Sequence, residues 1–193
     1  MLFRSLQLGT RRARAAALLT FSLPGGVYLY QGDELGLADV EDIPEALLQD
    51  PIWSRSGHTV RGRDGCRVPL PWSGETPPYG FSAPGTRTWL PQPDNWQSLS
   101  VEAQQRDSGS MLSLHRAALR LRRETPGFRT DDFRWRTGPG GALYFERGDG
   151  LRCVVNFGPA ELTVDPGWEV LLASTGSVER SLPPDSAVWL RST

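Results

Sequence analysis

The stretch VYLYQGDE, residues 27–34, constrains the fold more than any other part of the sequence. Its first four residues are β-branched, aromatic or aliphatic and lie between Pro-Gly-Gly and Gln-Gly, which predicts a short buried strand with turns at both ends. A strand this apolar is typical of a parallel sheet that is covered on both faces. Gln31, Asp33 and Glu34 follow at its carboxyl end, where α/β folds place their ligand sites. The stretch therefore predicts an α/β fold.

A second unusual segment is GRDGCRVPLPW, residues 62–72. Arg63, Asp64 and Arg67 lie within five residues and are followed by Pro69 and Pro71. Prolines stiffen such a loop, and a rigidly held guanidinium can donate in-plane hydrogen bonds to carboxylates or hydroxyls. The alternative is a surface loop whose arginines and aspartate merely pair with one another, since structural ion pairs are common.

Together, YQGDELG and RDGCRVPLPW resemble the closing part of the catalytic barrel in glycoside hydrolase family 13, the α-amylase family, and most closely its α-glucosidase and oligo-1,6-glucosidase branch. The resemblance continues through LHRAALRLRRETPGF and VVNFGPAELTV and covers nearly the whole chain. It implies the last β/α unit of a (β/α)8 barrel followed by a β-domain. The barrel would be incomplete, because a full one needs about 250 residues.

Composition argues against several function classes. A formal net charge of −1 gives no electrostatic basis for binding nucleic acid or an acidic membrane, and no apolar run reaches the roughly 18 residues of a membrane span. The two histidines and the distant Cys66 and Cys153 show no metal-ligand spacing. We therefore predict no metal, no cofactor and two reduced thiols.

The first 23 residues carry arginines ahead of an apolar stretch, as a secretory signal does. However, no small-residue cleavage site follows, and the apolar run leads directly into the predicted strand at residues 27–30. A barrel helix that precedes its strand explains this pattern better. Together with the reduced thiols, it leads us to expect a cytoplasmic protein.

The region between the predicted strand and residue 127 is mostly loop. We expect a short helix around Pro44–Leu48, and the resemblance makes Gln49 and Asp50 further candidates for contact with a substrate on the acceptor side. Aromatic residues between 73 and 96 are expected to fasten a long loop more than to wall a sugar site. From Ser100 the spacing of apolar residues predicts one helix, which Thr125-Pro126-Gly127 ends.

From Phe128 onward, short strands alternate with Gly- and Pro-rich turns, which predicts a small antiparallel β-sandwich. The fold class is therefore α/β followed by all-β, with a barrel portion at 1–127 (helix, strand 8, long loop, helix 8) and a β-sandwich at 128–193. The predicted strands are Phe133–Arg136, Leu143–Glu146, Arg152–Phe157, Leu162–Val164, Trp168–Ala173 and Ala187–Leu190.

Retaining glycoside hydrolysis needs two carboxyl groups about 5–5.5 Å apart. In the resembled family these follow the fourth and fifth barrel strands, and a third carboxylate lies in an N-H-D motif after the seventh. The sequence contains no N-H-D, so we predict no catalytic residue in this chain. Asp33 and Glu34 are adjacent and would point in different directions, which argues against an opposed pair across a scissile bond. The resemblance implies a supporting role for both residues.

The predicted substrate-binding residues are Arg63, Arg67 and Asp64. The resemblance implies that Arg63 reaches the non-reducing glucose of an α-glucoside oligosaccharide in the innermost subsite. Arg67 is expected to support the loop, and Asp64 to pair with one of the two arginines. Arginine stays protonated, so neither arginine can perform general acid/base catalysis.

The sequence thus predicts the C-terminal fragment of a retaining α-glucosidase that acts on maltose- and isomaltose-type oligosaccharides and is inactive alone. Two alternatives stay open. One is a stand-alone, non-catalytic sugar-binding or scaffold protein. The other is a fragment of a related trehalose synthase or sucrose isomerase. The first would use tryptophans for stacking, with candidates Trp89, Trp96, Trp135 and Trp168.

Overall fold

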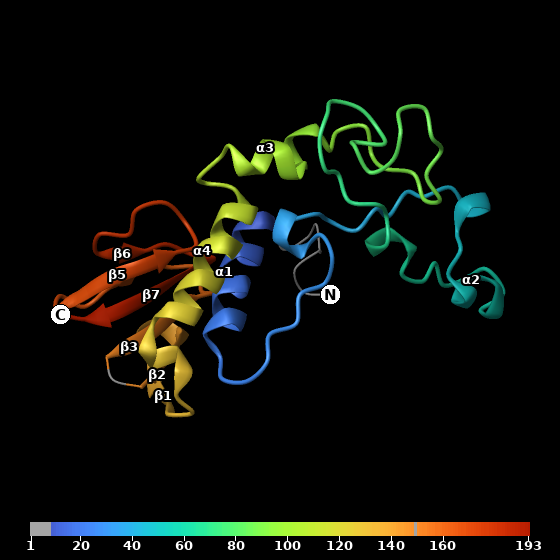
Figure 1. Ribbon diagram of the computed structural model, residues 1–193. Helices are drawn as coiled ribbons and strands as arrows, with labels where there is room; N and C mark the ends of the chain where they lie inside the picture. The colour runs from blue at the N-terminus through green and yellow to red at the C-terminus, as the bar shows by residue number, and fades with distance from the viewer. Residues whose placement is uncertain (1–8, 149) are drawn as a thin grey trace. The chain divides into compact units, whose positions relative to one another are not determined.

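The computed structural model describes residues 9–148 and 150–193, which fall into two compact units (Figure 1). The first unit is Leu29–Ser113, and the second combines residues 9–28 with residues 114–193. Each unit has its own hydrophobic core. The domain boundary predicted at residue 127 stays a prediction.

The first unit consists of loops and short helices around one core. The buried side chains of that core are Leu35, Leu37, Ile43, Val68, Tyr79, Leu90, Trp96 and Leu112. The short helix expected around Pro44–Leu48 is present as one turn of 3-10 helix. The helices are η1 Asp33–Leu35, η2 Glu45–Leu47, α2 Pro51–Arg55, η3 Asp64–Cys66, η4 Gln97–Leu99 and α3 Val101–Gln105.

The strand predicted at residues 27–30 is absent, so this prediction is wrong for the structure. Tyr28, Leu29 and Tyr30 are 92%, 45% and 38% exposed rather than buried. A strand exists through hydrogen bonds to a neighbour, and no strand of the described residues pairs with this segment. Its apolar sequence therefore cannot by itself impose a strand.

The single helix predicted from Ser100 is interrupted. Ser100 caps α3, as expected, but α3 ends at Gln105 and a second helix, α4 Met111–Glu124, begins six residues later. Between them, Asp107 accepts a hydrogen bond from the backbone N–H of Gly109 at 2.8 Å. Hydrogen bonds of this kind, from a side chain to the nearby backbone, compete with the hydrogen bonds of a helix. Asp107 therefore interrupts the helix, and the spacing of the apolar residues gives no sign of this interruption.

The second unit contains the N-terminal helix and all the strands. The helix predicted within the first 23 residues is confirmed as α1 Gly9–Ser22, and residues 1–8 lie outside the described part. All six predicted strands are confirmed, and one two-residue strand, β6, was not predicted. The strands are β1 Phe133–Thr137, β2 Leu143–Arg147, β3 Leu151–Asn156, β4 Leu162–Thr163, β5 Trp168–Ala173, β6 Ser181–Leu182 and β7 Ser186–Ser192. Two single turns, η5 Pro126–Arg129 and η6 Pro139–Gly141, complete the unit.

Five of the strands form one antiparallel sheet in the order β1-β2-β3-β7-β5, while β4 and β6 pair separately. Helix α1 packs on one face of the sheet, where the indole N–H of Trp189 donates to the carbonyl of Leu18 at 3.2 Å. Helices α1 and α4 lie side by side (Figure 1). The rings of Phe21 in α1 and His115 in α4 meet edge to face, with their centres 5.1 Å apart. The predicted order of an α/β part and an antiparallel β part is thus confirmed.

The side chains of strand β3 face both sides of the five-stranded sheet. Cys153 lies in register between Phe145 and Trp189, and its thiol accepts a hydrogen bond from Ser22 of α1 at 3.3 Å. Val154, the next residue, belongs to a core cluster with the β4–β6 pair. Because side chains alternate across a strand, β3 packs against α1 on one face and against the β4–β6 pair on the other. Both faces are buried, which explains why its sequence is apolar at successive positions.

Candidate functional site

The Arg63 loop is built around one buried carboxylate. Asp64 is 2% exposed, and its Oδ2 accepts the backbone N–H groups of Gln49 and Asp50 at 2.7 and 2.8 Å. Buried carboxylates need such donors, because an unpaired one would lose its hydration without compensation. Asp64 therefore ties the start of α2 to the loop that carries Arg63.

Asp50, which precedes α2, in turn binds the backbone of the Arg63 loop. Its Oδ2 accepts the backbone N–H of Arg63 at 3.0 Å and lies 3.2 Å from Nη1 of Arg67, while Oδ1 caps α2 through the N–H of Ile52. The hydrogen bonds from the Ile52 and Arg63 backbones lower the pKa of Asp50, so this carboxylate stays ionised. The sequence analysis missed this role, although an Asp directly before a Pro at the first helical position is a capping signal.

Two glycines make the close approach of these segments possible. A Cβ on Gly65 would lie 2.5 Å from the carbonyl oxygen of Val40, whose own N–H donates to Gly65 at 3.1 Å. Gly62 has a φ of +78°, and a Cβ there would lie 2.6 Å from the Asp50 side chain. Both positions therefore require glycine for steric reasons.

The two arginines of the loop are in different situations. Arg67 faces two carboxylates, Asp50 at 3.2 Å and Asp64 at 3.9 Å, so the expected pairing with Asp64 is the longer of the two. Arg63 is exposed, and within residues 9–148 and 150–193 its guanidinium forms no hydrogen bond or ion pair. The loop borders a cavity of about 610 Å³ that Asp39 and Glu41 line from the other side. Arg63 thus offers its donors at this cavity, while Arg67 holds the loop.

Asp33 and Glu34 lie in η1 and bind the backbone next to them. Oδ2 of Asp33 accepts the N–H of Tyr30 at 3.2 Å, and Oε2 of Glu34 accepts the N–H of Gly32 at 2.9 Å. Both carboxylates therefore hold the turn after residue 30. This geometry fits the supporting role expected for them.

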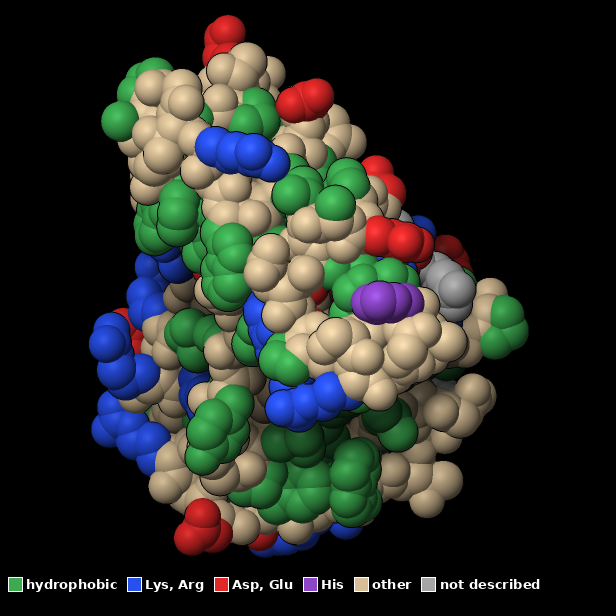
Figure 2. Space-filling view, turned by 90° about the vertical axis from the view of Figure 1, so that its right-hand side faces the viewer, with side chains coloured by type: hydrophobic (Ala, Val, Ile, Leu, Met, Phe, Trp, Pro, Cys, Tyr) green, Lys and Arg blue, Asp and Glu red, His purple; other side chains and the backbone are tan. Residues whose placement is uncertain are grey.

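The aromatic residues of the long loop divide into two groups. Tyr79 and Trp96 are buried, and the Tyr79 hydroxyl accepts the N–H of Trp96 at 3.2 Å and donates to the carbonyl of Pro93 at 3.1 Å. Trp89 is 72% exposed. On the face shown in Figure 2, hydrophobic side chains lie among polar ones. Buried aromatics thus fasten the loop, as expected, and Trp96 is no longer a candidate for stacking on a sugar.

Cys66 and Cys153 are both buried, and neither forms a disulfide with another described residue. In the part of the chain that the structure describes, no cluster of three or more His, Cys, Asp or Glu could hold a metal ion. No helix among these residues has the length and apolar character needed to cross a membrane.

Two models of known protein families match this chain. Residues 4–131 match the model of the alpha-amylase catalytic domain. The chain belongs to the alpha-amylase family. Residues 128–189 match a further model that accompanies it, a domain of unknown function named DUF3459. The Arg63 loop and η1 both lie in the part that matches the catalytic domain.

The relatives of this chain include a probable alpha-glucosidase and a trehalose synthase/amylase. A probable alpha-glucosidase of Rhizobium meliloti is 35% identical over 138 residues, which is 72% of this chain and 24% of that protein. The trehalose synthase/amylase TreS of Mycobacterium tuberculosis is 36% identical over 121 residues, or 60% of this chain and 17% of that protein. The chain therefore spans about a quarter or less of the length of these relatives.

A solved structure of the family agrees with the fold. The alpha-glucosyl transfer enzyme XgtA superposes with a TM-score of 0.79 at 30% identity, covering 99% of this chain and 37% of that one. This chain thus shares its fold with one stretch of the XgtA structure.

Proposed function

We propose that this chain forms the C-terminal part of a retaining α-glucosidase that acts on maltose- and isomaltose-type oligosaccharides. Two findings support this proposal. The relatives include a probable alpha-glucosidase and an alpha-glucosyl transfer enzyme, and the chain covers a limited share of each. In this proposal residues 1–127 contribute to the barrel and residues 128–193 form the β-domain.

The observation that carries the proposal is the exposed guanidinium of Arg63. Its backbone N–H is fixed by Asp50 at 3.0 Å, yet its guanidinium forms no hydrogen bond or ion pair with another described residue. Arginine offers five donors in a planar fork, which suits the adjacent hydroxyls of a glucose unit. Arg63 is therefore the proposed substrate contact, and Asp64 and Arg67 position it.

This arrangement provides binding without bond cleavage. The carboxylates of the loop, Asp50 and Asp64, are engaged by backbone N–H groups and by Arg67, so neither is available as nucleophile or proton donor. The catalytic carboxylates of the proposed enzyme therefore lie outside these 193 residues. We expect the purified chain to show no hydrolysis of p-nitrophenyl α-glucoside, and turnover would contradict this part of the proposal.

A chimera tests the role of Arg63 directly. The 193 residues replace the corresponding 37% of XgtA, and glucosyl transfer from p-nitrophenyl α-glucoside is measured. We expect an active chimera whose kcat/KM falls by about 10- to 100-fold with Arg63→Ala, as for the loss of a charged hydrogen-bond donor to substrate. Arg87→Ala serves as the matched control, because Arg87 is exposed and forms no hydrogen bond or ion pair with another described residue. Equal activity of the two variants would remove Arg63 from the site.

A trehalose synthase is the second candidate, because TreS is 36% identical over its matched residues. Genomic sequence upstream of the Met1 codon separates both candidates from a stand-alone sugar-binding or scaffold protein. An in-frame continuation that encodes N-H-D supports an enzyme, whereas a stop codon followed by a ribosome-binding site supports the stand-alone protein. As part of the proposal we place the protein in the cytoplasm, because two buried thiols that form no disulfide among the described residues are typical of that compartment.

A further inference from the structure

Both backbone polar groups of Arg63 are bound by side chains of the first unit. Asp50 accepts the N–H of Arg63 at 3.0 Å, and the thiol of Cys66 donates to the carbonyl of Arg63 at 3.2 Å. Cys66 is 2% exposed, so its thiol is shielded from solvent. Because the N–H and the carbonyl are both held, the backbone of Arg63 has little freedom to turn. Cys66 therefore helps to orient Arg63.

Tyr30 lies next to this thiol. Its hydroxyl forms hydrogen bonds with the side chains of Cys66 and Arg67. Partial burial, the largest cause, and the bond to Cys66 raise the pKa of Tyr30, while Arg67 offsets only part of this increase. The hydroxyl thus keeps its proton at neutral pH, and it can accept from Arg67 while it donates to the sulfur.

These contacts form a continuous chain of hydrogen bonds. Arg67 donates to the Tyr30 hydroxyl, which donates to the sulfur of Cys66. The Cys66 thiol donates in turn to the carbonyl of Arg63. Arg67 also pairs with Asp50 at 3.2 Å, and Asp50 accepts the N–H of Arg63, so the chain closes into a ring. Hydrogen bonds in such a network strengthen one another and fix the groups that they join.

The turn that carries Tyr30 is itself bound in place. Oδ2 of Asp33 accepts the N–H of Tyr30 at 3.2 Å, and the N–H of Asp33 donates to the carbonyl of Tyr30 at 3.1 Å. The side-chain amide of Gln31 donates to the carbonyl of Cys66 at 3.5 Å. The polar residues that follow residue 30 thus hold the Tyr30 ring against the loop of Arg63.

We infer that Tyr30 is a positioning residue for Arg63 and that it acts through the thiol of Cys66. This inference rests on the proposed function, in which Arg63 contacts the substrate. Arg63 and Cys66 both line the cavity of about 610 Å³, so a shift of the thiol moves the wall from which Arg63 projects. Tyr30 sets the direction of the guanidinium and does not itself bind the sugar.

A double-mutant cycle in the XgtA chimera tests this inference. Tyr30→Phe removes the hydroxyl and keeps the ring, and kcat/KM for p-nitrophenyl α-glucoside should fall about 3- to 10-fold. The fall should come mainly from a higher KM, because a binding contact is misdirected while the chemical step is untouched. In an Arg63→Ala background the same change should have no effect, since the side chain that Tyr30 positions is gone.

Substitutions of Cys66 test the path of this effect. Cys66→Ala removes the link between Tyr30 and Arg63, and should lower kcat/KM by about as much as Tyr30→Phe. Cys66→Ser keeps one donor and one acceptor at the same position, so it should restore most of the lost kcat/KM. Equal activity of the Ala and Ser variants would contradict the path through Cys66.

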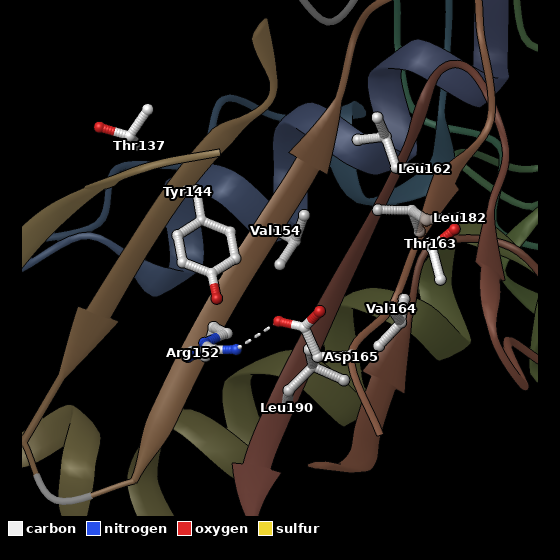
Figure 3. Close-up of a pocket in the computed structure, with 10 residues that line it drawn as sticks. All are labelled: Thr137, Tyr144, Arg152, Val154, Leu162, Thr163, Val164, Asp165, Leu182 and Leu190. Atoms are coloured by element: carbon white, nitrogen blue, oxygen red, sulfur yellow. Dashed lines mark hydrogen bonds and ion pairs between the residues drawn. The ribbon is translucent and has the colours of Figure 1, made fainter. Parts of the chain in front are cut away.

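Tyr144→Phe is the matched control. Tyr144 lies in the second unit, where it lines the cavity between the five-stranded sheet and the β4–β6 pair (Figure 3). The guanidinium carbon of Arg152 lies 4.7 Å from the centre of its ring. Both tyrosines therefore lie beside an arginine, and burial raises the pKa of each. Tyr144→Phe should leave kcat/KM of the chimera unchanged.

Alkylation of the 193-residue chain by iodoacetamide gives a readout that is independent of activity. Mass spectrometry of the peptides that contain Cys66 and Cys153 measures each thiol separately. Cys66 should react about 3- to 10-fold faster in the Tyr30→Phe variant, because the ring of hydrogen bonds around it is open. Cys153 should react at the same rate in both proteins.

The outcomes separate this inference from the proposed function. Full activity of the Arg63→Ala chimera would contradict the proposed function, and the inference with it. A loss with Arg63→Ala but none with Tyr30→Phe would overturn the inference alone. An equal fall caused by Tyr30→Phe in the presence and absence of Arg63 would also overturn it, as would an unchanged alkylation rate of Cys66.

Discussion

The carboxylate of Asp64 accepts the backbone N–H of Asp50 at 2.8 Å, while the carboxylate of Asp50 accepts the backbone N–H of Arg63 at 3.0 Å. These reciprocal bonds join the start of α2 to the loop before η3 through two acidic side chains. The loop that presents Arg63 is therefore held by carboxylates that cannot be replaced by neutral side chains without loss of its anchor points.

Replacing Asp64 by Ala should loosen this loop. The N–H groups of Gln49 and Asp50 would lose a buried acceptor, at a cost of about 1–3 kcal/mol for an unsatisfied buried group. Hydrogen exchange followed by mass spectrometry should show faster exchange of residues 49–50. Asp42→Ala, at an exposed position, is the control and should leave exchange unchanged. Equal protection in both variants would disprove the anchoring role.

Gly65 should tolerate no side chain. An added Cβ would lie 2.5 Å from the Val40 carbonyl, so Gly65→Ala must displace the loop and disturb the Val40–Gly65 hydrogen bond. We expect a loss of about 1–3 kcal/mol in the free energy of unfolding, measured by urea denaturation. At Gly176 a Cβ meets no atom within 4 Å, so Gly176→Ala should cost far less.

Arg147 should be essential for the second unit. It is 3% exposed and donates to the carbonyls of Ser22, Phe128 and Thr130 at 3.1, 3.1 and 2.6 Å. Arg147→Met leaves three carbonyls without this donor, and we expect unfolding at a urea concentration lower by an amount equivalent to about 2–4 kcal/mol.

Arg191→Met is the control for this change, because it removes an exposed arginine that pairs with Glu169 at 2.6 Å. An exposed ion pair contributes about 0–1 kcal/mol. A midpoint for Arg147→Met as high as that of Arg191→Met would show that the three carbonyl bonds add little.

Cys153 should make stability fall at alkaline pH. Burial raises the pKa of its thiol from 9.0 to about 12. Above pH 9.0 the unfolded chain releases this proton while the folded chain keeps it up to about pH 12, so the free energy of unfolding declines across that window and is unaffected below it. The decline should approach about 1.4 kcal/mol per pH unit.

Denaturation of the unchanged chain and of Cys153→Ala between pH 8 and pH 11 measures this effect. The variant loses some packing at all pH values but should show a flatter alkaline decline, because it has no thiol to ionise. Parallel curves for the two proteins would rule out a contribution from Cys153.

Local sequence patterns predicted the short strands of the second unit and the ends of the helical region that starts at Ser100. The alternating residues and Gly- and Pro-rich turns after residue 128 identified six of the seven strands, because each strand is short and bounded by its own turn signals. Ser100 as a cap and Thr125-Pro126 as a stop identified the ends of the predicted helical region, although Asp107 and Gly109 divide it. The position of β7 between β3 and β5 depends on pairing between strands that lie far apart in the sequence, so no local sequence pattern predicts it.

The sequence by itself determined the family, the β-strands of the second unit and the residues of the Arg63 loop, because these depend on residue identity and short-range spacing. The tertiary structure decided that residues 27–30 form no strand and that Asp50 anchors the loop. It also decided that Arg67 pairs with Asp50, whereas the Arg63 guanidinium forms no hydrogen bond or ion pair with any described residue. A strand needs a neighbour, and a side chain is engaged or free according to what lies beside it. Strand pairing and side-chain engagement both depend on contacts between segments that are distant in the sequence. Local sequence patterns do not predict such contacts.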